Sequence, residues 1–341
     1  MKNLFLMAAA ITTLFCSCNK ESICELTSAS DTKSPAVTLS FDGEISPTKA
    51  FFDPTATAES WEKSLSSVSV LVFGTDGQLL VQRNFTDSEL SLKKATFAIP
   101  NALAGQSCDF YVIANKTISG ISNKAELMNL TETAPADYNG TFAEVSTKAK
   151  RSGGFIMTGH TTKAIASQGA QTNVSVTLKR TVAKIAIQAS TTAEFSERYL
   201  GKVRINSAAL SKGASKGLLI AQSSPETGSM SYSHTQTTDE KSGKFCNLFY
   251  VLENGVLAEG NRLLLTLSAT YDRDGNFSTT ADQVDVTYPV ELSGNGAGQF
   301  IRNGYYRVQV QIDGLTGSEI SASISVGDWE TPVTQSVNLG E

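Results

Sequence analysis

Along most of this chain, apolar and polar residues alternate with a period of two, and short runs rich in Gly, Ser, Thr and Asn separate the alternating stretches. Alternation puts one set of side chains on each face of a strand, so the pattern predicts β-structure. The clearest hairpin is predicted over 67–85, with Asp76 and Gly77 at its turn. One short helix is expected over 122–130, and the polar stretch from there to Gly154 predicts a loop.

The apolar residues change parity within the stretch 173–189, from even positions such as Val176 to odd positions such as Ile185. A single straight strand cannot do this, because a shift of one residue sends every side chain to the opposite face. We therefore expect a bulge or a crossover between two domains at 179–181. The strands that follow have hairpin and Greek-key spacing.

The predicted fold class is all-β with a minor helix. Two β-sandwich domains of Greek-key or transthyretin-like type are expected in tandem, at 50–178 and 179–330. With 341 residues the chain is long enough to bury two cores.

The chain starts Met1-Lys2-Asn3 and continues as an apolar segment that is too short to span a bilayer, which is typical of a signal peptide. A cysteine lies where the polar sequence begins, so 1–18 is interpreted as a lipoprotein signal. Cys18 is the predicted lipidated residue, because small Ser17 precedes it whereas bulky Phe15 precedes Cys16. A simple secretory signal with incidental cysteines is the alternative.

Beyond the signal the cysteines are Cys24, Cys108 and Cys246, an odd and widely spaced set that does not form a disulfide framework. Cys108 and Cys246 lie in apolar stretches and are expected to be buried free thiols, with a disulfide as the alternative. The net charge of −5 gives no basic patch, so no nucleic-acid partner is expected.

Candidate catalytic chemistry is sparse. The only histidines, His160 and His234, have no cysteine or carboxylate at metal-ligand spacing and are expected to be ordinary loop residues. Asp272–Asn276 resembles the start of a calcium loop, but Gln283 stands where a bidentate glutamate is needed, so a β-turn is expected. We expect no metal, no cofactor and no enzymatic activity.

The first strong strand pattern places Val37, Leu39, Phe41 and Ile45 on one apolar face, and it is followed by Pro47 and Lys49. A proline-containing linker offers a protease an extended backbone. We interpret 19–49 as a propeptide that is cut after Lys49 and carries a removable strand. The alternative is that Lys49 is one solvated lysine among many.

A second strand of similar pattern closes the chain at 331–341, where Val333, Val337 and Leu339 alternate with polar residues. Loss of the first strand would open an apolar groove with unpaired backbone groups, which is costly. The C-terminal strand of a neighbouring molecule is the predicted occupant. Because such an exchange is head to tail, it makes a filament.

Several motifs give the chain a family resemblance. "VTLSFDG…SPTKAFF", "SSVSVLVFGTDGQLL" and "FYVIANK" resemble the N-terminal domain of the type V fimbrial subunits, the fimbrillins of Bacteroidetes, and "KRTVAKIAI" and "NGYYRVQVQI…VGDWETP" resemble their second domain. The resemblance implies a precursor held at the outer membrane by its lipid and a trypsin-like protease specific for Lys or Arg. It also implies a cut between Lys49 and Ala50.

The resemblance further implies that the mature chain lies in fimbriae at the cell surface, where it supports adhesion. Its partners would be other copies of itself and minor fimbrial subunits. Within the same system the alternatives to a stalk subunit are a tip adhesin, which needs no donor tail, and a basal anchor, which keeps its lipid. A surface lipoprotein that binds glycans is the alternative from another class, and it would need clustered exposed aromatic residues.

Overall fold

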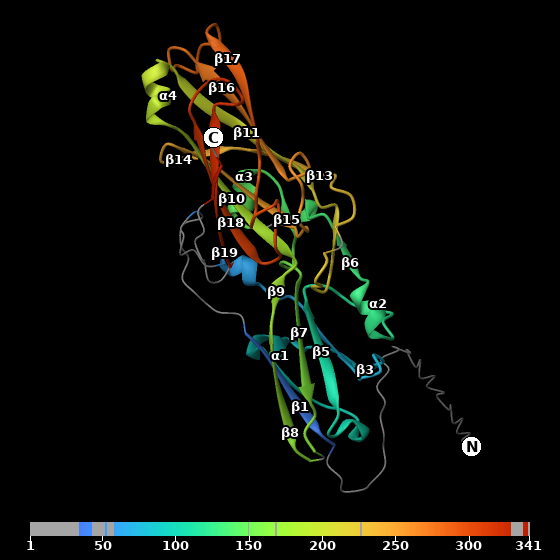
Figure 1. Cartoon of the computed structure of the whole chain (residues 1–341). Coiled ribbons are helices and arrows are strands. Elements are labelled where there is room, and N and C mark those ends of the chain that lie inside the picture. Colours follow the sequence, from blue (N-terminus) through green and yellow to red (C-terminus); the bar gives the residue numbers. More distant parts are fainter. Residues whose placement is uncertain are drawn as a thin grey trace, which may run out of the picture. The chain divides into compact units, whose positions relative to one another are not determined.

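The computed structural model describes residues 34–42, 52, 58–148, 150–167, 169–225, 227–328 and 337–339. Within these ranges strands dominate and the helices are short. The predicted all-β class is confirmed, because the strands form two β-sandwiches that follow one another along the chain (Figure 1). The described residues belong to one compact unit, Ser34–Glu341.

The first sandwich consists of a three-stranded and a five-stranded sheet. The smaller sheet has the spatial order β4 (Lys94–Ala98), β1 (Ala36–Asp42), β8 (Gln171–Thr177). The larger sheet has the order β3 (Leu79–Asn84), β2 (Val68–Phe73), β5 (Ser107–Ala114), β7 (Met157–Ala164), β9 (Lys179–Arg180). Every second residue of β4 and β8 is buried, as alternation requires.

The predicted hairpin over 67–85 is confirmed as the antiparallel pair β2 and β3, with Gly77 at a positive φ of 77° in the turn. All six residues of β2 are buried, not only one face. Its second face lies in a small outer core with Leu127 of the short helix α2 (Lys124–Met128). The helix expected over 122–130 is therefore present and covers this sheet.

The second sandwich packs a six-stranded sheet on a four-stranded sheet. The six-stranded sheet has the order β14 (Asp239–Lys241), β15 (Lys244–Leu252), β10 (Val182–Thr191), β18 (Gly304–Ile312), β19 (Ile320–Asp328), β20 (Val337–Leu339). The four-stranded sheet has the order β13 (Tyr232–Thr237), β11 (Lys202–Gly213), β16 (Leu264–Asp272), β17 (Gln283–Glu291). A separate small pair joins β12 (Lys216–Leu218) to β6 (Thr131–Thr133).

The expectation of a loop up to Gly154 was wrong. This stretch contains β6 and the helix α3 (Phe142–Thr147). The helix forms because Thr141 and Glu144 make a capping box, and because Phe142 and Val145 share one buried face. The remaining helical elements are α1 (Asp87–Leu92), α4 (Ala193–Arg198) and the 3₁₀ turns η1 (Ser60–Lys63), η2 (Asn101–Leu103), η3 (Ala136–Tyr138).

The parity change in 173–189 marks a crossover, one of the two expected alternatives. β8 lies in the three-stranded sheet, whereas β9 pairs with β7 of the opposite sheet. After Thr181 the chain enters β10 of the second sandwich. Val176 is thus buried in the first core and Ile185 in the second, although their positions differ in parity. The division into domains at 178/179 stays a prediction.

A buried carboxylate joins the 3₁₀ turn η1 to the second sandwich. Glu62 lies in η1 and is fully buried, and its Oε1 lies 2.7 Å from Nζ of Lys184 on β10. The Tyr250 hydroxyl on β15 donates to the same oxygen at 2.8 Å, and the backbone N–H of Glu59 donates to Oε2 at 2.7 Å. Buried charge is tolerated only when it is paired and hydrogen-bonded, and Glu62 meets both conditions.

The neighbours of Glu62 set its protonation. Burial by itself would raise its pKa, but the positive charges of Lys184 and Arg180 outweigh burial and hold the pKa of Glu62 below its ordinary value of 4.5. A carboxyl with a lowered pKa stabilises the folded state above its unfolded pKa, and this contribution is lost as the pH falls through the folded pKa. Burial raises the pKa of Tyr250 well above 10, so its hydroxyl keeps its proton and donates.

We predict that Glu62→Gln lowers the free energy of unfolding at neutral pH by about 3–5 kcal/mol, because Lys184 stays buried without its counter-charge. Urea unfolding of the full chain measures this. The difference from wild type should shrink as the pH falls from about 5 to about 3, where the wild-type carboxylate is also lost.

The control is Glu319→Gln, which breaks the exposed ion pair with Arg198 and should change stability little. Equal losses from Glu62→Gln and Glu319→Gln would contradict a special contribution of the buried pair.

Candidate assembly site

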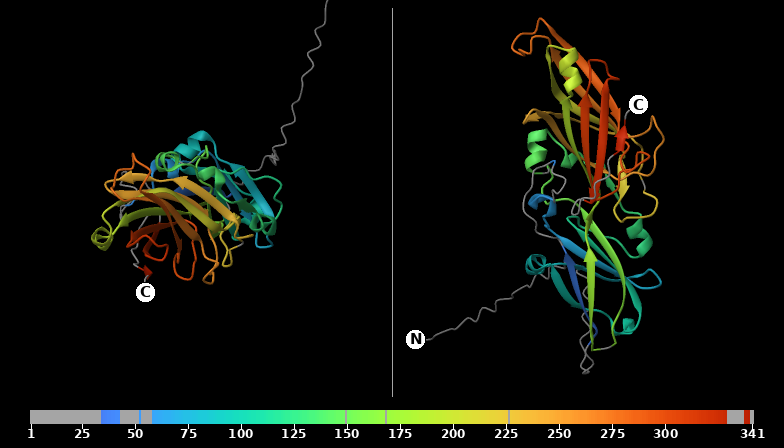
Figure 2. Two further views of the ribbon diagram at one scale, coloured as in Figure 1. Left: turned by 90° about the horizontal axis from the view of Figure 1, so that it is seen from above. Right: turned by 60° about the vertical axis from the view of Figure 1, so that its left-hand side comes forward.

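β1 is the middle strand of the three-stranded sheet (Figure 1, Figure 2). It pairs antiparallel with β4 over Ala36–Ser40 and parallel with β8 over Ala36–Asp42. Within the described residues no pairing joins β4 directly to β8. Removing β1 alone would therefore leave two facing rows of unpaired backbone groups.

The inner face of β1 is completely buried. Val37 and Leu39 have exposed fractions of 0% and Phe41 of 1%, and the Phe41 ring lies 5.5 Å from the ring of Phe85. Burial of such side chains is worth about 1.5–3 kcal/mol each. The space below β1 is thus an apolar groove between β4 and β8, filled by three side chains of β1.

The other face of β1 makes polar contacts. The hydroxyl oxygens of Thr38 and Thr96 lie 2.9 Å apart across the pair with β4, and the Gln171 amide of β8 donates to Thr38. The pairing of β1 with β4 continues one residue beyond the strand ladder, because the backbone N–H of Phe41 donates to the Lys93 carbonyl at 3.2 Å. β1 therefore pairs through its backbone on both edges, packs apolar side chains on its inner face and makes side-chain hydrogen bonds on its outer face.

Five of the predicted site residues lie outside the described residues. They are Cys18, Ile45, Lys49, Ala50 and Val333. Ala58 and the turn η1 follow the predicted cut and are described, and Ala58 is buried with an exposed fraction of 3%. The buried carboxylate of Glu62 thus belongs to the part of the chain that a cut after Lys49 would leave.

The predicted tail residues Val337 and Leu339 lie in β20, whose backbone pairs antiparallel with the edge of β19 opposite Ile324 and Ala322. The tail is therefore the outer strand of the six-stranded sheet. Within one chain the structure does not bring it to the groove, which β1 already occupies.

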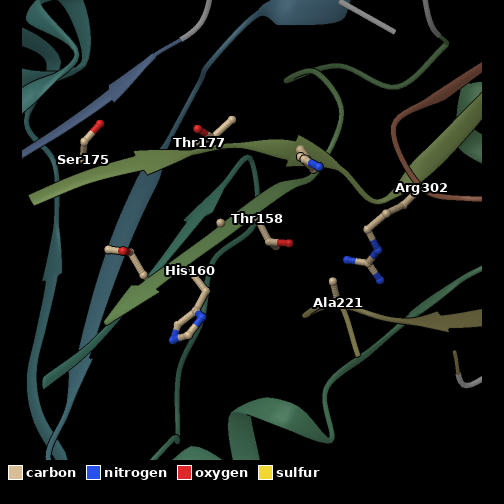
Figure 3. A pocket seen from close by; sticks show the side chains of 9 residues that line it. Thr158, His160, Ser175, Thr177, Ala221 and Arg302 are labelled. Carbon is tan, nitrogen blue, oxygen red and sulfur yellow. The ribbon is translucent and has the colours of Figure 1, made fainter. Parts of the chain in front are cut away.

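A polar hollow of about 390 Å³ is bordered by β7 and β8 (Figure 3). It is lined by Thr158, Gly159, His160, Thr161, Ser175, Thr177, Lys179, Ala221 and Arg302. The Arg302 guanidinium is already used within the protein, because it is ion-paired with Glu253 and donates to the Leu219 carbonyl at 2.9 Å.

Close contact between β7 and β8 depends on Gly159. A Cβ at this position would lie only 2.4 Å from the Thr177 carbonyl oxygen, so any larger residue would push the strands apart.

The two histidines, considered above as candidate metal ligands or nucleophile partners, lie on strands and contact neighbouring residues of the fold. His160 and His234 lie on β7 and β13, so the expectation of loop positions was wrong. The His160 ring stacks on Tyr111 at 4.3 Å, and the His234 ring is bonded to the Gly140 carbonyl at 2.9 Å.

Both described cysteines are buried free thiols, as expected. Cys108 and Cys246 each have an exposed fraction of 1%. Burial raises the pKa of both thiols, which disfavours the reactive thiolate.

The acidic stretch after β16 is a longer loop than the expected β-turn, because β17 begins only at Gln283. Carboxylate oxygens of Asp272, Asp274 and Asp282 lie within 4.8 Å of one another. Asp272 accepts hydrogen bonds from the Asn276 backbone and from the Gln283 amide, both at 2.9 Å. These bonds stabilise the conformation of the loop.

Of the helices that the described ranges contain, none is long and apolar enough to cross a membrane. Residues 36–180 match the family model of the major fimbrial subunit protein (FimA). The match runs from the first residue of β1 to the last residue of β9, so it covers the first sandwich. No curated protein matches the chain.

Solved fimbrial proteins share the fold of nearly the whole chain. A fimbrilin from Porphyromonas gingivalis is 15% identical, with a TM-score of 0.58 over 89% of this chain and 99% of that chain. The C-terminally truncated tip fimbrial protein of Porphyromonas gingivalis is 14% identical, with a TM-score of 0.53 over 87% and 100%. A fimbrial assembly protein from Parabacteroides distasonis is 13% identical, with a TM-score of 0.51 over 90% and 99%.

At such low identity the solved structures establish the fold alone, and the similarity to the fimbrial family rests on the match of the first sandwich. That match contains β1 as an integral strand, together with both of its neighbours. Over residues 36–180 the chain is therefore similar to the FimA major fimbrial subunit family, a family of structural fimbrial subunits.

Proposed function

We propose that this chain is a stalk subunit that polymerises by donor-strand exchange after a protease removes β1. The observation that carries the proposal is the position of β1, the first described strand of the chain and yet the middle strand of its sheet. One cut beyond Asp42 would free such a strand without breaking any other strand. The groove would then need a replacement strand from another molecule.

The C-terminal tail is the proposed replacement. Its apolar residues Val333, Val337 and Leu339 alternate with polar ones, as do the residues of β1. Backbone pairing with β4 and β8 would supply affinity, and the buried side chains would set the register. Because each subunit accepts one strand and donates another, the assembly continues head to tail with further copies and minor fimbrial subunits.

Lys49 is the proposed cutting site, with Ala50 as the new N-terminus and a trypsin-like protease specific for Lys or Arg as the enzyme. It follows β1 by seven residues and precedes the buried Ala58. Cleavage there would remove β1 and keep η1, which contacts the second sandwich through the Glu62 side chain. The remaining chain would thus keep its second core intact.

Cys18 is the proposed lipid attachment site, by which the precursor reaches the outer membrane before cleavage. The mature subunit would then leave its lipid behind with the propeptide and support adhesion as part of a fimbria. Fimbrial subunits as a family lie in cell-surface fimbriae.

Two roles in the same fimbrial system, and one role of another class, compete with the stalk proposal. The fold is similar to both a fimbrilin and a tip protein, so it does not separate a stalk subunit from a tip adhesin, and a basal anchor is the third role in the same system. The C-terminal strand pattern favours the stalk. For a glycan-binding lipoprotein, exposed aromatic side chains would be needed, whereas the large exposed apolar residues of the described chain are aliphatic: Leu92, Leu200, Val256, Val284 and Ile301.

The first test concerns the cut. Mass spectrometry of surface fimbriae should find Ala50 at the N-terminus, and Lys49→Ala should leave an unpolymerised subunit because β1 stays in the groove. Thr48→Ala, which keeps the lysine, is the matched control and should assemble normally. Normal fibres from Lys49→Ala would move the cutting site elsewhere, and an N-terminus found only at lipidated Cys18 would indicate a basal anchor.

The second test concerns export. Cys18→Ala should prevent the precursor from reaching the outer face of the outer membrane, because no thiol remains for the lipid, whereas Cys24→Ala should have no effect. Metabolic labelling with a fatty acid and surface immunoblotting measure both steps. Equal surface amounts of the two variants would refute lipidation at Cys18.

The third test concerns strand donation. Deletion of 333–341 should abolish long fibres and leave cleavage at Lys49 unchanged, as judged by electron microscopy and mass spectrometry. Val337→Asp should act in the same way, since a charge cannot enter an apolar groove without a large cost. Asn338→Asp, on the opposite strand face, is the control. Normal fibres from the deletion, or equal loss from both point variants, would refute donation by the tail.

A further inference from the structure

The chain passes from the first sandwich to the second at residues 178–182, here called the crossing, and two buried carboxylates flank it. One is Glu132 of β6, with an exposed fraction of 6%. Its Oε2 accepts a hydrogen bond of 2.7 Å from the Thr181 hydroxyl, and its Oε1 accepts one of 2.9 Å from the Tyr138 hydroxyl. Nη1 of Arg151 lies 3.4 Å from the Glu132 Oε1 and supplies positive charge.

The second carboxylate belongs to Glu62, a residue that contacts Arg180 through its backbone and Lys184 through its side chain. Arg180 of β9 donates through Nε to the Glu62 carbonyl at 2.9 Å, and Lys184 of β10 forms the 2.7 Å ion pair with its side chain. Arg180 is itself buried, with an exposed fraction of 2%. Glu62 and Glu132 come from separate segments that both precede the crossing, so the crossing is bonded by two independent elements.

The backbone of the crossing is bonded as well. The N–H of Thr181 donates to Ile156 at 3.0 Å in the first sandwich, and the N–H of Asn303 in the second sandwich donates to Val182 at 2.8 Å. The Asn303 amide oxygen also accepts from Arg180 Nη1 at 2.9 Å. Domains of one chain usually move relative to one another unless their interface is large and apolar.

Apolar side chains also connect the two sandwiches near the crossing. The core cluster that contains β1 also contains residues of β10, β15 and β18, among them Val182, Leu248 and Tyr305. Arg180, Thr181 and Val182 of the crossing are therefore buried beside a core that continues from one sandwich into the other.

The crossing also lies on a bonded route between the two strands that would join neighbouring subunits. β8 borders the groove and continues through β9 into β10. β10 pairs with β18, β18 pairs with β19, and β19 ends at Asp328, just before the tail. Tension applied between an inserted strand and the tail would pass through the crossing.

We infer that Glu62 and Glu132 lock the crossing, so that the two sandwiches move as one rigid body, and that this joint sets the bending stiffness of the fimbria. The lock follows from contacts within one chain. The effect on stiffness rests on the proposed function, because it requires the subunits to be linked through the groove and the tail.

Hydrogen exchange of the full-length chain, followed by mass spectrometry, tests the lock without polymerisation. Glu62→Gln together with Glu132→Gln should accelerate exchange of the Thr181 and Asn303 amides by about tenfold or more, because local opening of the crossing becomes cheaper. Exchange in β17, far along the chain from the crossing, should not change. Glu319→Gln, which breaks an exposed pair within the second sandwich, is the control and should leave both amides protected.

A milder variant keeps the test decisive if the double variant unfolds. Thr181→Val removes only the hydroxyl that donates to Glu132, at nearly constant volume, and should accelerate exchange of the same amides by a smaller factor. Unchanged exchange in Thr181→Val and in any folded double variant would overturn the lock.

Fimbriae of the Thr181→Val variant test the second part, by their persistence length in electron micrographs. A shorter persistence length than in wild type is expected, and an equal one together with faster exchange would overturn the effect on stiffness. If the chain with residues 333–341 deleted still forms fibres, the proposed function is refuted. The hydrogen-exchange result on the lock does not depend on that outcome.

Discussion

Buried backbone groups must be hydrogen-bonded, and this requirement makes β1 indispensable to the first sandwich. β4 and β8 are not paired with each other, so each depends on β1 for the ladder on its inner edge. The side chains of Val37, Leu39 and Phe41 add the apolar contacts that hold the three-stranded sheet on the five-stranded sheet. A sheet with an empty middle position is not a stable end state, so removal of β1 creates a demand for another strand.

The demand for a new strand arises in the three-stranded sheet of the first sandwich. The core between the two sheets of the second sandwich contains no residue of β1. Its central strand β10 is bonded to β15 and β18, which do not take part in the first sandwich sheets. A subunit that has lost β1 can therefore keep one complete sandwich, and the buried ion pair between Glu62 and Lys184 still ties η1 to it.

The sequence predicted the parts of this architecture that follow from local patterns. Alternation identified the strands, the Asp76-Gly77 turn identified the hairpin, and the parity change located the crossing. It was less informative where short elements depend on caps: α3 forms through Thr141 and Glu144 in a stretch that is too polar to show a helical period. His160 and His234 were wrongly expected in loops because polar residues on the outer face of a strand resemble loop sequence.

The groove and its three buried residues could be foreseen from the odd positions of β1, but the middle position of β1 could not, because strand order is a property of the tertiary fold. Glu62 and Glu132 gave no signal at all. A lone glutamate in a polar segment is usually exposed, and only the arrival of Lys184 and Thr181 from distant parts of the chain explains the burial of these two.

The mixed pairing of β1 has a further consequence for any strand that takes its place. One neighbour, β4, runs opposite to β1, and the other, β8, runs in the same direction. A strand entering the vacated position in either direction finds one parallel and one antiparallel edge, so the two orientations satisfy the same number of ladders. The backbone of the groove therefore has no polarity of its own, and the direction of insertion is left to the side chains.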